Sequence, residues 1–126
     1  MQASPIRIAT VVLGAFFTLQ GLGWLAVPAR AAAGLGMPLL DGIGRSTQIG
    51  DLTSFFVVAG LLMLGGSRPG HARLLAIPGL MLGVAAVART LAWAVHGAAF
   101  ATAFIAIEVA VAALLFTASR RLDAGR

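Results

Sequence analysis

The chain has 126 residues, of which 60% are hydrophobic and 10% are charged, and its mean hydropathy is +0.98. Soluble domains average about 45–50% apolar and about 25% charged residues, so this composition excludes an ordinary soluble globular domain and indicates a membrane protein. The net charge of +5 arises from arginines that flank apolar segments without interleaved aromatic residues, which excludes nucleic acid as the expected partner.

Four segments are long and apolar enough to cross a bilayer, which requires about 20 residues in a helix. They cover residues 6–27, 47–66, 73–95 and 98–118. Because backbone groups in hydrocarbon must be satisfied within a segment, each is predicted to be a helix. The short second and third connections make consecutive helices antiparallel. The sequence therefore predicts an all-α, integral membrane four-helix bundle, up-down-up-down, with one domain over residues 1–126.

The first segment has a second interpretation, as a cleaved signal peptide followed by the small residues 29–33. Its apolar run is longer than a typical signal core of about 7–15 residues, and Gln20 and Trp24 interrupt the approach to a cleavage site. We therefore expect this helix to be retained. The long connection over residues 28–46 is rich in Pro and Gly, and we expect it to be irregular or briefly helical at the membrane surface.

The distribution of arginine predicts the orientation. With four spans, one side carries six arginines: Arg7, Arg68, Arg73, Arg120, Arg121 and Arg126. The other side carries Arg30 and Arg45. The positive-inside rule then places both termini in the cytoplasm, and Trp24 and Trp93 near the outer interface. A composition rich in Ala, Gly, Val and Arg is typical of a bacterium with a GC-rich genome, so we expect a multi-pass protein of the inner (cytoplasmic) membrane.

Each predicted helix carries a polar residue in its outer half, and helical spacing groups further residues on the same faces. The members of this set, in chain order, are Gln20, Trp24, Thr47, Gln48, Asp51, Ser54, Arg89, Trp93, His96, Phe104 and Glu108. If these faces point inward, they form a polar pocket with apolar and aromatic walls that opens toward the outer side, as small-molecule sites commonly do. The predicted ligand-binding residues are Gln20, Trp24, Gln48, Phe55, Trp93, His96 and Phe104, and either Phe16 or Phe17 is expected to add to the wall.

Asp51, Arg89 and Glu108 are the candidate catalytic residues. A charge near the bilayer centre costs about 2.5–3.5 kcal/mol, whereas polar contacts between helices contribute about 0.6 and at most about 2 kcal/mol, so structural pairing is the weaker explanation. Two acids and one Arg leave one negative charge in excess. We expect Glu108, the deeper acid, to carry a proton at neutral pH and Asp51 to pair with Arg89, an arrangement suited to acid–base chemistry.

Neither a metal nor a cofactor is expected. The chain has no cysteine, and His96 lacks a second histidine near it that could share a metal ion. Gly79-x-x-x-Gly83 matches the motif for close packing of membrane helices, either within the chain or in a homodimer.

The chain resembles a group of small bacterial four-helix membrane proteins with the layout of the DoxX-like superfamily. The resemblance covers about residues 8–118 and rests on Pro28, on Asp51 ahead of a Gly-rich run, on Arg89 before His96-Gly97, and on Glu108. It implies the four-helix fold, and the Arg in the third helix and the Glu in the fourth helix that such families commonly show correspond to Arg89 and Glu108. Phe55-Phe56 stands where the group has a Gly, which changes the shape expected of a shared pocket.

Three functions are compatible with the sequence, and it leaves open whether the protein is an enzyme. The first is a pocket for a small lipophilic molecule, with acid–base chemistry such as isomerisation, cyclisation or epoxide opening. The second is a structural or accessory subunit whose 28–46 connection contacts a membrane partner protein. The third is a proton-coupled transporter, acting as a homodimer because four helices rarely enclose a pathway. Membrane lipid is a partner in all three.

Overall fold

A computed structural model describes residues 4–125, and these are helical, with no β-strand among them. The elements are α1 (Pro5–Ala26), α2 (Pro28–Gly34), α3 (Gly42–Gly66), the 3-10 turn η1 (Ala72–Leu75), α4 (Ala76–His96) and α5 (Thr102–Ala124). Within residues 4–125, four helices are long and apolar enough to cross a membrane: α1, α3, η1 with α4, and α5. The all-helical fold class and the four apolar spans are therefore confirmed, and the pattern is that of a multi-pass membrane protein.

Local chemistry explains where the helices begin and end. Ser4 caps α1 by accepting a hydrogen bond from Arg7 N at 3.4 Å, and Pro5 occupies its first turn, where no backbone donor is needed. α4 ends at His96, and the following Gly97 terminates the helix by adopting a left-handed φ of 66°, a conformation that glycine takes most readily. α3 begins at Gly42, ahead of the predicted residue 47, and the connection over residues 28–46 contains the short helix α2.

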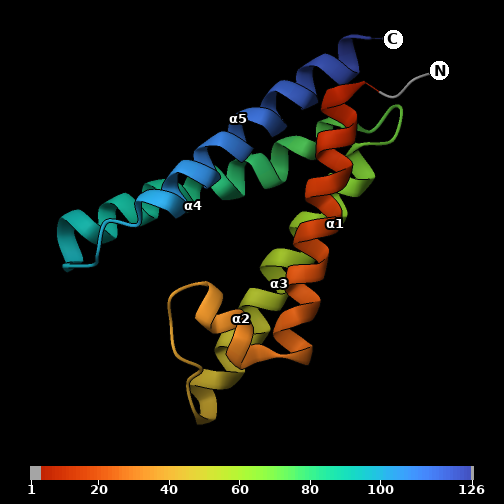
Figure 1. Cartoon of the computed structure of the whole chain (residues 1–126). Coiled ribbons are helices and arrows are strands. Elements are labelled where there is room, and N and C mark those ends of the chain that lie inside the picture. Colours follow the sequence, from red (N-terminus) through yellow and green to blue (C-terminus); the bar gives the residue numbers. More distant parts are fainter. Residues whose placement is uncertain (1–3, 126) are drawn as a thin grey trace.

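The long helices associate as two antiparallel pairs, α1 with α3 and α4 with α5 (Figure 1). Small residues bring α1 and α3 together: a Cβ atom added to Gly14 would lie 3.0 Å from Gly60 O, and one added to Gly21 would lie 2.8 Å from Val57 N. Close backbone approach of this kind is the usual basis of helix pairing in membranes, where lipid removes the hydrophobic driving force. The two pairs are thus the primary packing units of the fold.

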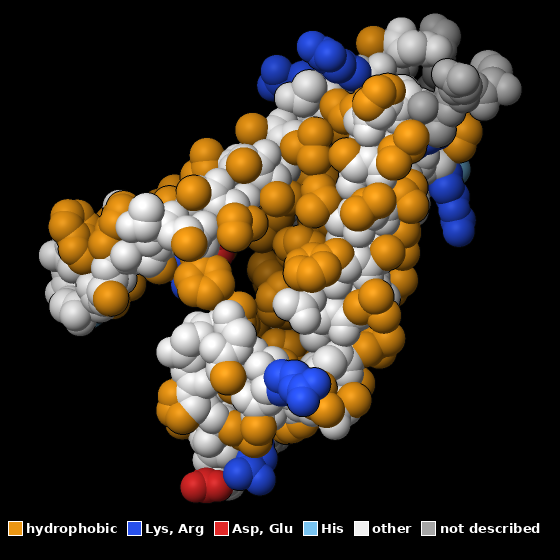
Figure 2. Space-filling view, in the orientation of Figure 1, with side chains coloured by type: hydrophobic (Ala, Val, Ile, Leu, Met, Phe, Trp, Pro, Cys, Tyr) orange, Lys and Arg blue, Asp and Glu red, His pale blue; other side chains and the backbone are white. Residues whose placement is uncertain are grey.

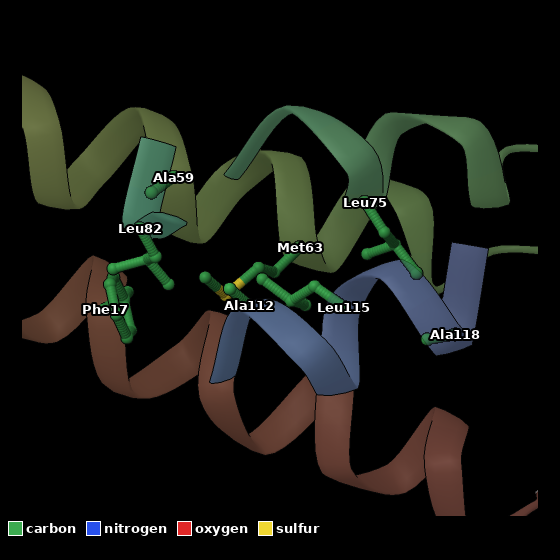
Figure 3. Close-up of a cluster of buried hydrophobic side chains, with 8 residues drawn as sticks. All are labelled: Phe17, Ala59, Met63, Leu75, Leu82, Ala112, Leu115 and Ala118. Atoms are coloured by element: carbon green, nitrogen blue, oxygen red, sulfur yellow. The ribbon is translucent and has the colours of Figure 1, made fainter. Parts of the chain in front are cut away.

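The pairs join at the end of the molecule where α1 begins and α5 ends (Figure 1). The buried apolar core lies there and draws on all four long helices and η1 (Figure 3); its members are Phe17, Ala59, Met63, Leu75, Leu82, Ala112, Leu115 and Ala118. Polar contacts strengthen this end, because Arg7 Nη1 donates to Ser67 O at 2.7 Å and the buried Thr10 and Ser67 hydroxyls lie 2.7 Å apart. The junction therefore combines apolar packing with hydrogen bonds between helices.

Away from the junction the two pairs diverge (Figure 1). Phe17 packs on Phe56 with ring centroids 5.5 Å apart, and Phe55 packs on Phe56 at 5.2 Å. All three rings line the space between the two pairs. This space is a cleft between α1–α3 and α4–α5.

Candidate functional site

The cleft contains a cavity of about 380 Å³. Figure 2 shows the hollow between the two helix pairs, with hydrophobic side chains along its walls. Its lining residues are Phe16, Phe17, Gln20, Gly34, Leu35, Leu52, Phe55, Phe56, Leu82, Ala85, Arg89, Phe104, Ile107, Glu108 and Val111. Mostly apolar walls with a few polar groups are the usual composition of a small-molecule site.

Arg89 and Glu108 are the charged residues among those that line the cavity. Arg89 Nε donates to Glu108 Oε1 at 2.7 Å, the length of a hydrogen bond between charged partners. The Arg89 side chain is 35% exposed and that of Glu108 is 11% exposed. Glu108 Oε2 is buried without a hydrogen-bond partner in the described part of the chain. Arg89 is therefore the charged group that a molecule in the cavity meets.

The aromatic ring of Phe104 supports the guanidinium group, because Arg89 Cζ lies 4.8 Å from the ring centroid. Such a cation–π contact adds about 0.5–2 kcal/mol, depending on how far the cation is removed from water. Arg89 is thus held by a carboxylate on α5 and by a ring one turn earlier on the same helix.

The predicted pairing of Asp51 with Arg89 is wrong. Asp51 is exposed on α3, and no hydrogen bond or ion pair forms at its side chain within residues 4–125, whereas Arg89 pairs with Glu108. Thr47 and Ser54 lie on the same exposed face, so the helical spacing was interpreted correctly, but the face points away from the cleft. The residues of α3 that reach the cavity are Leu52, Phe55 and Phe56.

Three predicted ligand-binding residues line the cavity: Gln20, Phe55 and Phe104. Phe16 and Phe17, predicted as alternatives for one wall position, both line it.

Four predicted ligand-binding residues lie outside this cavity: Trp24, Gln48, Trp93 and His96. Trp24 is 1% exposed and packed within the fold, and Trp93 is 51% exposed, with its ring centroid 5.2 Å from that of Phe100. His96 is exposed at the end of α4.

Gln48 has a structural position. Its Oε1 accepts from Leu40 N at 2.8 Å, and its Nε2 donates to Pro38 O at 3.0 Å and contacts Met37 Sδ at 3.1 Å. The side chain is buried, so these bonds satisfy an amide that water does not reach. Gln48 thereby fixes the loop over residues 35–41, which follows α2 and includes the cavity residue Leu35.

We expect Gln48→Ala to free this loop locally while the helix pairs stay intact. The hydrogen bond from Leu40 N is partly buried, and a bond of this kind contributes about 0.5–1.5 kcal/mol. The exchange of the Leu40 amide hydrogen should therefore accelerate by up to about tenfold. Hydrogen exchange of the detergent-solubilised protein measures this, with Thr47→Ala, an exposed position on the same helix, as the control. Unchanged exchange at Leu40 in Gln48→Ala would contradict the assigned role.

Residues of the connection and apolar residues of α4 also line the cavity without having been predicted. Gly34 and Leu35 contribute from the end of α2, and Leu82 and Ala85 from α4. Ala85 and Leu82 precede Arg89 by one and two turns, so helical spacing from Arg89 could have identified them. Gly34 and Leu35 gave no such signal, because they lie at the end of a helix of only seven residues, which is too short to show a periodicity.

The Gly79-x-x-x-Gly83 motif contributes to packing at one end only. A Cβ atom at Gly79 would lie 3.4 Å from Leu115 Cβ on α5, whereas nothing lies within 4 Å of the corresponding position at Gly83. Among residues 4–125 no group of three or more His, Cys, Asp or Glu residues lies close enough together to hold a metal ion. The chemistry that this site offers is a guanidinium group, a carboxylate and an amide in an apolar cavity.

Comparison of the chain with protein-family models, with curated proteins and with solved structures finds no match. The resemblance to the DoxX-like superfamily stays a prediction.

Proposed function

We propose that this protein binds a small lipophilic molecule in the cleft between its two helix pairs. The observation that carries the proposal is the cavity of about 380 Å³ with a partly exposed Arg89 in a mostly apolar and aromatic wall. A charged side chain within a membrane span is costly, and such residues usually serve a ligand or transport pathway. A cleft between helices of a membrane protein is also open to molecules dissolved in the bilayer.

The structure favours binding over turnover as the first role of the site. Acid–base chemistry at Glu108 requires a carboxyl oxygen within hydrogen-bond reach of the reacting group. Glu108 Oε1 is engaged by Arg89 and Oε2 is buried, which leaves the guanidinium group as the accessible polar contact. We therefore assign Arg89 to ligand binding, and Glu108 to positioning Arg89 and balancing its charge.

A structural role for the pair is the second candidate, because Arg89 and Glu108 join α4 to α5 within one helix pair. An ion pair within one helix pair has the geometry of a cross-link, and it would serve this purpose with or without a ligand.

For the orientation, we propose that the end where α1 begins and α5 ends faces the cytoplasm of a bacterial cell. The exposed Arg68, Arg73, Arg120 and Arg121 belong to this end, and positive charge favours the cytoplasmic side. The cleft then opens toward the outer half of the membrane.

The proposed binding is tested by filling the cavity. Ala85 lines the cavity on α4, whereas Ala88 is exposed on the same helix and does not line it. We expect native mass spectrometry to detect a bound small molecule on the wild-type protein and on Ala88→Phe. Ala85→Phe should lose it, because the added ring occupies the ligand's space. Equal occupancy in the two variants, or no bound molecule on the wild type, would contradict the proposal.

A further inference from the structure

If the proposed binding function is correct, the guanidinium group of Arg89 restricts the chemical class of ligand that the cavity can bind. The Arg89 side chain is about three times as exposed as that of Glu108 (35% against 11%), so a ligand reaches the guanidinium group first. Arg89 uses its Nε–H for Glu108, and no hydrogen bond forms at its two Nη groups in the described part of the chain. Those N–H groups donate and cannot accept, so they select a ligand with an acceptor atom.

The charge balance of the site decides which acceptor fits. Arg89 and Glu108 lie 2.7 Å apart, and as an ion pair they carry no net charge. A ligand carboxylate would bring a second negative charge to one guanidinium group in a cavity with apolar walls, and uncompensated charge in such surroundings is costly. An uncharged carbonyl oxygen accepts the same hydrogen bonds and leaves the site neutral.

The size of the cavity adds a further restriction. About 380 Å³ lies near the lower end of the range of about 300–1,000 Å³ for small-molecule sites, which favours a compact or single-chain ligand over a phospholipid with two acyl chains. The Phe104 ring covers the guanidinium group at 4.8 Å, so the acceptor approaches at the edge of that group, where the N–H bonds point. Gln20 lines the same cavity and offers an amide to the polar end of the ligand.

We infer that the ligand is an uncharged, single-chain or compact lipophilic molecule whose polar end is a hydrogen-bond acceptor of the amide, ester or ketone type, held by the Nη groups of Arg89. Carboxylates of the same chain length are disfavoured.

Three probes with the same chain test this inference: decanamide, decanoate and decane. Each is titrated into protein with nitrogen-15-labelled arginine in detergent micelles, and the Arg89 Nε–H resonance, assigned by its absence in Arg89→Lys, reports binding. Ala85→Phe provides the baseline for partition of the probes into micelles. A hydrogen bond to a charged group corresponds to about tenfold or more in affinity, so decanamide should bind at least that much more tightly than decane. Decanoate should also bind more weakly than decanamide, because it brings an additional negative charge into a cavity with apolar walls.

The outcomes distinguish an incorrect ligand class from an incorrect binding function. Tighter binding of decanoate than of decanamide, or equal binding of decanamide and decane, would overturn the ligand class while leaving a binding site. If no probe shifts the Arg89 resonance beyond the Ala85→Phe baseline, the proposed binding function fails and the ligand class with it.

Discussion

Replacing Glu108 by alanine is expected to destabilise the protein by about 3 kcal/mol, because it leaves Arg89 without its counter-charge inside a membrane span. The loss of one partner from a buried ion pair costs about 3–5 kcal/mol, and the lower end applies because Arg89 is partly exposed to the cavity. The free energy of unfolding in bicelles, measured by steric trapping or by titration with dodecyl sulfate, reports this change.

The double variant Arg89→Met with Glu108→Leu separates structure from function. Apolar residues of similar volume commonly replace a buried ion pair at little or no cost, so the double variant should recover to within about 1.5 kcal/mol of the wild type. Ligand binding should still be lost, since no donor remains at this position. A double variant that is stable and retains the bound molecule would show that the pair serves packing alone.

Asp51→Ala is the matched control, since it removes an acid from α3 that is exposed and makes no bond within residues 4–125. Since no contact of the fold is lost with this side chain, Asp51→Ala should not destabilise the protein. We expect the bound molecule to remain, because Asp51 does not line the cavity. A loss of stability equal to that of Glu108→Ala would mean that Asp51 has a role that its position on an exposed face does not explain.

The four apolar helices were predictable because length and composition decide whether a segment can cross a membrane, and both can be counted in a sequence. The partner of Arg89 was also within reach. Arg89 and Glu108 lie at similar distances from the connection between α4 and α5, so antiparallel packing of these neighbours sets them opposite each other. Our prediction paired Arg89 with Asp51 because Glu108 is the deeper acid. The depth of a residue in the membrane does not show toward which neighbouring helix its side chain points.

Helical spacing shows which residues share a face, but it does not show which neighbour covers that face. In a soluble protein the polar face of a helix points outward, whereas in a membrane both inward and outward faces are apolar, and this contrast is lost. Gly60 fixes the α3 face that meets α1, and this choice turns Phe55 toward the cleft and Asp51 away from it. Because the chain has 16 glycines, the sequence did not show which of them bring α1 and α3 into close contact.

Gly60→Ala is therefore expected to destabilise the α1–α3 pair by about 1–3 kcal/mol, the usual cost of forcing an extra methyl group into a packed interface. The added Cβ would lie 2.5 Å from Thr18 N and 2.7 Å from Gly14 O, and it would also overlap Thr18 Oγ1. Two of these three atoms are backbone atoms, which cannot rotate away, so α1 as a whole must move. The free energy of unfolding in bicelles measures the effect.

Gly50→Ala on the same helix is the control, since nothing lies within 4 Å of the position that its Cβ would take. Alanine is favoured over glycine in a helix by about 0.5–1 kcal/mol, so this variant should be as stable as the wild type or more stable. Destabilisation by Gly50→Ala, or none by Gly60→Ala, would contradict the assigned α1–α3 contact. Movement of α1 also displaces Phe16, Phe17 and Gln20 from one wall of the cavity. Gly60→Ala should consequently weaken ligand binding although Gly60 does not line the cavity, and Gly50→Ala should leave binding unchanged.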